Sequence, residues 1–220
     1  MPDVLIEAAV ESIVAVRAAE RHGAGRIELC ADLDGGGVTP SPSLLEEAVR
    51  VTRLPIHVMI RPRGGNFVYD ASEVEAMCAA AADARAAGAA GIVTGALSPD
   101  GSLDLPGIER IRIAAGPLAT VVHRAFDQVS RPRDALDELI ELGVAGVLTA
   151  GGSGTAAEGI PRLRQLADAA RGRLEIIAGG SVSAADVVRI VRDTGVRVIH
   201  ARCGNDGGRI AGIVGALSKR

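Results

Sequence analysis

The chain has 220 residues, and its 24 lysine and arginine residues against 27 aspartate and glutamate residues give a net charge of −3. Aromatic residues make up only 1% of it, so it lacks the stacking platform that single-stranded nucleic acids require, and it has no basic run to follow a phosphate backbone. No apolar stretch approaches the roughly 20 residues of a membrane span, and no signal segment opens the chain. We therefore expect a cytoplasmic protein that binds neither nucleic acid nor membrane.

The three cysteines, Cys30, Cys78 and Cys203, are widely spaced. They form no disulfide framework and no paired-thiol metal motif. No linker or shift in composition divides the chain. We expect one domain covering residues 1–220.

Short apolar segments, rich in β-branched residues, alternate with longer helical segments along the whole chain. There are eight of them, at residues 4–10, 26–33, 56–63, 91–97, 120–127, 146–151, 174–180 and 196–202. Nearly continuous apolar character predicts parallel strands that are covered on both faces.

Helix-capping residues stand between these segments. Ser12 opens a helix that ends near Gly23, and Ser41 caps a helix whose first residue is Pro42. Further helices are predicted from Asp70 or Ser72 to Gly88, over 132–142 after Ser130, over 184–193 after Ser183, and from about 208 to 217.

Eight strand–helix units of about 27 residues each predict a single-domain α/β fold, the TIM (β/α)₈ barrel. A doubly wound open sheet is the alternative. It is disfavoured because Val10-Glu11-Ser12 follows the first strand in place of a G-x-G-x-x-G turn.

Polar residues interrupt the predicted strands, where a buried charge must be paired or face a wet cavity. Side-chain alternation places Glu28 with Cys30, Met59 with Arg61, and His123 with Asp127, each pair on one face of its strand. If these faces point inward, the side chains meet at the C-terminal mouth of the barrel, where barrels carry function. The full set is Glu7, Glu28, Cys30, His57, Arg61, Arg63, His123, Arg124, Asp127, His200 and Arg202.

Acid–base chemistry is predicted for His123 and Asp127 near the end of the fifth strand, because histidine titrates near neutrality and a carboxylate can orient it. Glu28 is a second candidate carboxylate. For Arg61 two interpretations stay open: an ion pair with Glu28, or neutralisation of a ligand's charge.

Two glycine pairs follow the sixth and seventh strands, Gly151-Gly152 and Gly179-Gly180. Such loops expose backbone N–H groups and form anion cradles, although glycine also serves tight turns alone. We expect these loops, together with Arg63, to hold the phosphate or carboxylate of a small ligand.

Cys30 also has two interpretations. A lone buried cysteine is commonly a small core residue. A thiolate is also a soft ligand that selects Cu(I), and Met59 on the neighbouring strand offers a second soft atom.

Several sequence blocks together resemble the CutC family of copper homeostasis proteins. They are Arg26-Ile27-Glu28-Leu29-Cys30-Ala31, Gly36-Gly37-Val38-Thr39-Pro40-Ser41, Val58-Met59-Ile60-Arg61-Pro62-Arg63-Gly64-Gly65, Phe67-Val68-Tyr69, His123-Arg124-Ala125-Phe126-Asp127, Leu148-Thr149-Ala150-Gly151-Gly152 and Ala178-Gly179-Gly180. The resemblance covers essentially the whole chain. It implies a TIM barrel, a cytoplasmic location, a homodimer or higher homo-oligomer, and Cu(I) binding at Cys30.

Two hypotheses about function therefore stand. The first is a copper homeostasis protein that binds Cu(I) through Cys30. The second is an enzyme or sensor for a small anionic metabolite, with Glu28, Arg61, His123 and Asp127 as catalytic residues. Whether the protein is an enzyme is left open.

Overall fold

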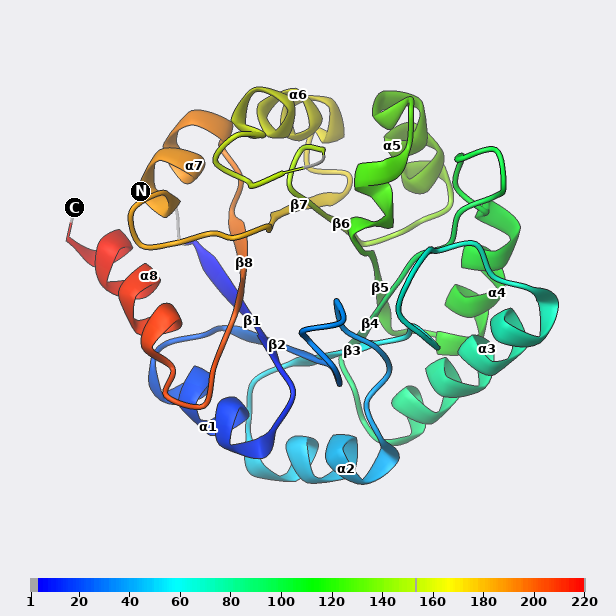
Figure 1. Cartoon of the computed structure of the whole chain (residues 1–220), viewed down its shortest axis with the longest axis horizontal. Helices are drawn as coiled ribbons and strands as arrows, with labels where there is room; N and C mark the ends of the chain where they lie inside the picture. Colours follow the sequence, from blue (N-terminus) through cyan, green and yellow to red (C-terminus); the bar gives the residue numbers. More distant parts are fainter. Residues whose placement is uncertain (1–3, 153, 220) are drawn as a thin grey trace.

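The computed structural model describes residues 4–152 and 154–219 and forms a closed barrel of parallel strands surrounded by helices (Figure 1). The strands pair in the order β1 to β8, and β8 closes the sheet on β1. They are β1 (Leu5–Val10), β2 (Arg26–Leu29), β3 (Ile56–Met59), β4 (Gly91–Thr94), β5 (Ala119–Val122), β6 (Gly146–Thr149), β7 (Glu175–Ala178) and β8 (Val198–Arg202). The predicted (β/α)₈ barrel is confirmed, and the open sheet is excluded.

Eight α-helices alternate with the strands in the described residues. They are α1 (Ile13–Arg21), α2 (Pro42–Val51), α3 (Ala71–Ala86), α4 (Leu105–Ala115), α5 (Pro132–Glu141), α6 (Ile160–Ala170), α7 (Val187–Thr194) and α8 (Gly208–Ser218). The Ser12 side chain caps α1, and Asp70 with Glu73 forms a capping box on α3. None of the described helices is long and apolar enough to cross a membrane.

The sequence signals misplaced several boundaries. Helices α4 and α6 were not among the helices predicted individually, although each carries proline in its first turn, which is compatible with a helix start. Arg131, not Ser130, is the N-cap of α5, and α7 begins after Asp186 because Ser183 donates a hydrogen bond to that carboxylate. The predicted fifth strand was too long.

The fifth strand ends at Val122 because the next residue starts a 3-10 helix, η1 (Arg124–Gln128). The His123 side chain caps η1 by accepting a hydrogen bond from the Ala125 N–H at 3.2 Å. Asp127 therefore does not share a strand face with His123, contrary to the alternation assumed from the sequence.

Two cores result from the barrel geometry. The larger lies between the strands and the helices, and the smaller fills the barrel interior with Cys30, Met59, Val93, Val121, Leu148, Ile177 and Val198. Polar inward side chains gather on β8, β1, β2 and β3, where Glu7, Arg26, Glu28, His57 and His200 are all largely buried. The barrel interior thus combines an apolar cluster with a buried charged group that is confined to four neighbouring strands.

Candidate functional site

The C-terminal ends of the strands surround a pocket of about 330 Å³, the size of a small-metabolite site. We call this the mouth pocket. Its floor consists of Glu28, Cys30, Met59 and His200, which come from β2, β3 and β8 or directly follow these strands. The segment between β2 and α2 lies over the centre of the barrel (Figure 1).

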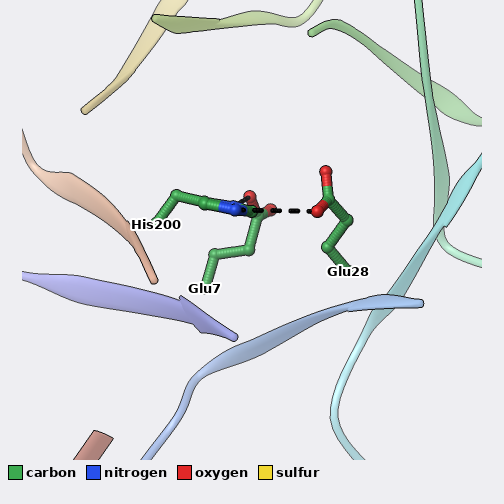
Figure 2. A group of neighbouring side chains, drawn as sticks. All are labelled: Glu7, Glu28 and His200. Carbon is green, nitrogen blue, oxygen red and sulfur yellow. Dashed lines mark hydrogen bonds and ion pairs between the residues drawn. The ribbon is translucent and has the colours of Figure 1, made fainter. Parts of the chain in front are cut away.

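Three polar side chains converge inside the barrel from neighbouring strands, Glu7 from β1, Glu28 from β2 and His200 from β8 (Figure 2). His200 Nδ1 lies 2.9 Å from Glu7 Oε1, and His200 Nε2 lies 3.6 Å from Glu28 Oε2. Glu7 also pairs with Arg26, whose Nε lies 2.5 Å away. Because Glu7 takes the Nδ1 side of the ring, it orients Nε2 toward Glu28.

The electrostatics of this cluster follow from burial and from the facing charges. Burial opposes ionisation of Glu7, but the hydrogen bond and charge of His200, together with Arg26, lower its pKa to about 2. Burial and the neighbouring Glu7 raise the pKa of Glu28. Burial opposes protonation of His200, yet Glu28 and Glu7 raise its pKa overall. Glu7 therefore stays ionised at neutral pH, while Glu28 and His200 compete for a proton.

The donor atoms of this cluster lie within 4.8 Å of one another, close enough to ligate one metal ion. The sequence had marked Glu28 as a site residue but not Glu7 or His200. Both stood out as polar residues in buried strands. Their place beside Glu28 becomes visible in the structure, where β8 closes the barrel on β1 and pairs His200 with Glu7.

Two sulfur-bearing side chains lie next to this cluster. Leu29 pairs with Val58 across β2 and β3, so the residues that follow, Cys30 and Met59, are neighbours. A Cβ atom on Gly37 would lie 3.5 Å from Cys30 Sγ and 3.6 Å from Met59 Cε, which places both side chains beneath that backbone. Cys30 Sγ donates a hydrogen bond to Glu28 Oε2 at 3.5 Å. Burial, followed by the Glu28 carboxylate, raises the pKa of this thiol well above its usual range.

Arg61 closes one wall of the mouth pocket. Its guanidinium donates to the carbonyl oxygens of Gly36 and Gly37 at 3.1 Å each and of Gly65 at 2.9 Å, and lies 4.8 Å from the Phe67 ring centre. It makes no ion pair with any described carboxylate. The ion pair with Glu28, one of the two interpretations left open, is absent from the described residues.

His123 lies beside the same phenylalanine, with a ring-centre distance of 4.8 Å to Phe67. It is 4% exposed, and burial followed by the charge of Arg61 lowers its pKa to about 3. Its Nδ1 accepts from Ala125, so the ring is neutral with its proton on Nε2. It lines the mouth pocket, where its Nε2–H is a hydrogen-bond donor.

Asp127 occupies a different position from the one predicted. Its carboxylate accepts hydrogen bonds from the backbone N–H groups of Ala150 and Gly152 and from the Thr149 hydroxyl. It also pairs with Arg124 at 2.8 Å. The protein's own carboxylate thus fills the cradle that Gly151-Gly152 was expected to offer to a ligand, and Gly151 N–H donates to the Thr149 hydroxyl.

Of the other residues predicted to bind an anion, one lines the mouth pocket and two do not. Gly180 lines the mouth pocket, whereas Gly179 N–H donates to the Thr149 carbonyl in the sheet. Arg63 lies outside the pocket lining and pairs with Glu73, with Nε 2.5 Å from Oε1. His57 lies deeper than the pocket, near Glu7, and burial lowers its pKa to about 4.

Comparison with known proteins assigns the chain to a family. The model of the CutC family matches residues 4–205. The chain belongs to the CutC family. Among its CutC relatives, the copper homeostasis protein cutC homolog of Mus musculus is 42% identical over 206 residues, which cover 93% of this chain and 76% of the mouse protein. The Homo sapiens homolog is 40% identical over 206 residues, which again cover 93% of this chain and 76% of the human protein.

A solved CutC structure supports the same assignment. The crystal structure of the CutC protein from Streptococcus agalactiae is 33% identical and has a TM-score of 0.86, covering 90% of this chain and 97% of that chain. The predicted family, its connection with copper homeostasis and the barrel fold are therefore confirmed.

Proposed function

We propose that this CutC family member binds Cu(I) at the floor of the mouth pocket, with the Cys30 thiolate and the Met59 thioether as ligands. The observation that carries the proposal is the placement of these two side chains side by side beneath Gly37. Thiolate and thioether sulfur are the protein ligands that select Cu(I).

The surroundings of the two side chains suit a soft monovalent cation. Cys30 is fully buried and Met59 is 5% exposed, so little water competes for the ion. His200 Nε2 faces the same floor and offers an imidazole nitrogen, oriented by Glu7. A Cu(I)–thiolate pair carries no net charge, which limits the cost of burying it.

Coordination of Cu(I) by Cys30 requires a proton to leave the thiol, because the thiol is neutral before the ion binds. The Cys30 S–H bond breaks, an S–Cu(I) bond forms, and the proton passes along the existing hydrogen bond to the Glu28 carboxylate. The raised pKa of Glu28 suits it to keep that proton.

An anaerobic titration of Cu(I) against a competing chelator tests the proposal. We expect Cys30→Ser to weaken Cu(I) binding by about 100-fold or more and Met59→Leu by about tenfold, corresponding to roughly 3 and 1.4 kcal/mol. Cys78→Ser is the matched control, because Cys78 lies on α3, away from the pocket. Parent-like affinity in Cys30→Ser would show that this thiol is not a ligand.

We also propose the cytoplasm as the working compartment. All three cysteines are free in the structure, in keeping with a reducing environment. The homodimer or higher homo-oligomer that the family resemblance implies stays a prediction, which size-exclusion chromatography with light scattering measures directly.

A further inference from the structure

Arg61 presents a buried positive charge without a counter-ion. The residue is 4% exposed, its described partners are three neutral carbonyl groups, and its Nε–H meets no described acceptor. Burying a cation is costly unless an anion compensates it. The mouth pocket, which Arg61 lines, is the space in which such an anion can lie.

A second unpartnered donor lies against the same phenylalanine, Phe67. His123 Nε2 is buried and meets no described acceptor, while its Nδ1 is fixed as the cap of η1. The Arg61 guanidinium and the His123 ring each lie 4.8 Å from the Phe67 ring centre. Two buried donors thus lie against one aromatic ring in the lining of the pocket.

Most of the other charged residues that line the pocket are arginines. Arg124, Arg202 and Arg209 line it together with Arg61, against a single carboxylate, that of Glu28. Arg209 makes no ion pair with any described residue, whereas Arg202 and Arg124 pair with acidic neighbours.

The loop after β7 adds backbone donors to this wall. Gly180, Ser181 and Val182 line the pocket, and their N–H groups donate to no acceptor in the described part of the chain. Backbone N–H groups without an acceptor and arginine side chains, brought together in the lining of one cavity, are the usual components of an oxyanion site.

We propose that the mouth pocket binds a small organic anion whose carboxylate or phosphate oxygens contact the Arg61 guanidinium and His123 Nε2, with the loop 180–182 completing the site. A cavity of about 330 Å³ limits the ligand to the size of a small metabolite. The site is separate from the Cu(I) ligands, because it uses nitrogen donors of the wall and not the two sulfur atoms of the floor.

Isothermal titration calorimetry in a low-salt buffer tests this site, with inorganic phosphate and malonate as separate probes for the two oxyanion types. We expect at least one probe to bind the parent. His123→Asn should weaken binding about tenfold, because Asn keeps an acceptor for Ala125 but withdraws the Nε2 donor. Arg61→Gln should weaken it further. Arg63→Gln is the matched arginine control and should change affinity less than about twofold.

Two results would overturn the proposal. One is the absence of heat and of a thermal shift with either probe, and the other is equal affinity in His123→Asn and Arg63→Gln. Arg61 also holds three loop carbonyls, so if Arg61→Gln does not fold, His123→Asn still decides. Cys30→Ser should retain anion binding, and His123→Asn should retain Cu(I) affinity, so the failure of one proposal is distinguishable from that of the other.

Discussion

Neutral His123 should make the protein sensitive to mild acid. The perturbation is a shift from pH 7 to pH 5, compared between the parent and His123→Asn. In the folded protein burial and Arg61 lower the pKa of His123 from 6.5 to about 3. A histidine with a lowered folded pKa contributes stability above its unfolded pKa, and that stability is lost as the pH falls from 6.5 toward 3.

The magnitude follows from this shift. Each pH unit below 6.5 costs about 1.4 kcal/mol, so His123 alone lowers the free energy of unfolding by about 2 kcal/mol between pH 7 and pH 5. His57, whose pKa is about 4, acts in the same direction. His57, Glu28 and His200 are present in both proteins, so their effects cancel in the difference.

The assay is equilibrium unfolding in urea at pH 7, 6 and 5, followed by far-UV circular dichroism. His123→Asn retains a side-chain oxygen to cap η1 but has no group that titrates in this range. We expect the parent to lose about 2 kcal/mol more than the variant between pH 7 and pH 5. Parallel pH profiles, differing by less than about 0.5 kcal/mol, would refute the assignment of a neutral buried imidazole.

Two further predictions concern buried carboxylates. Asp127→Ala should lower the free energy of unfolding by about 3 kcal/mol, because it leaves the N–H groups of Ala150 and Gly152 unpaired. Asp137→Ala, which removes only exposed pairs with Arg133 and Arg173, should cost less than about 1 kcal/mol in the same urea assay, and equal losses would contradict this role for Asp127. Glu7→Gln should cost about 3 kcal/mol, because Arg26 then loses its buried ion pair and keeps the one with the partly exposed Glu175. It should also lower the pKa of His200, measured by NMR titration, and an unchanged pKa would show that Glu7 does not stabilise the imidazolium.

The sequence predicted the barrel because eight apolar segments alternate with capped helices, a pattern that few other folds satisfy. It also predicted that Glu28, Cys30, Met59 and Arg61 face one mouth, since side-chain alternation along two parallel strands requires it. The sequence did not give the register between β1 and β8, and this register places His200 beside Glu7.

Other parts of the site depend on geometry that a linear pattern does not carry. Asp127 was assigned to a strand face, but the backbone turns into η1 directly after His123 and directs the carboxylate to the loop after β6. Arg61 was expected to meet either Glu28 or a ligand. In place of Glu28, the loops before α2 and α3 supply neutral carbonyl partners, which leave its charge uncompensated within the described residues.

The central claim is that sulfur atoms on the pocket floor hold Cu(I). X-ray absorption at the copper K-edge of protein loaded anaerobically with one equivalent of Cu(I) tests it most directly. The account predicts sulfur scatterers in the first coordination shell of copper in the parent, and their loss or halving in Cys30→Ser. A coordination shell of nitrogen and oxygen alone in the parent would contradict it.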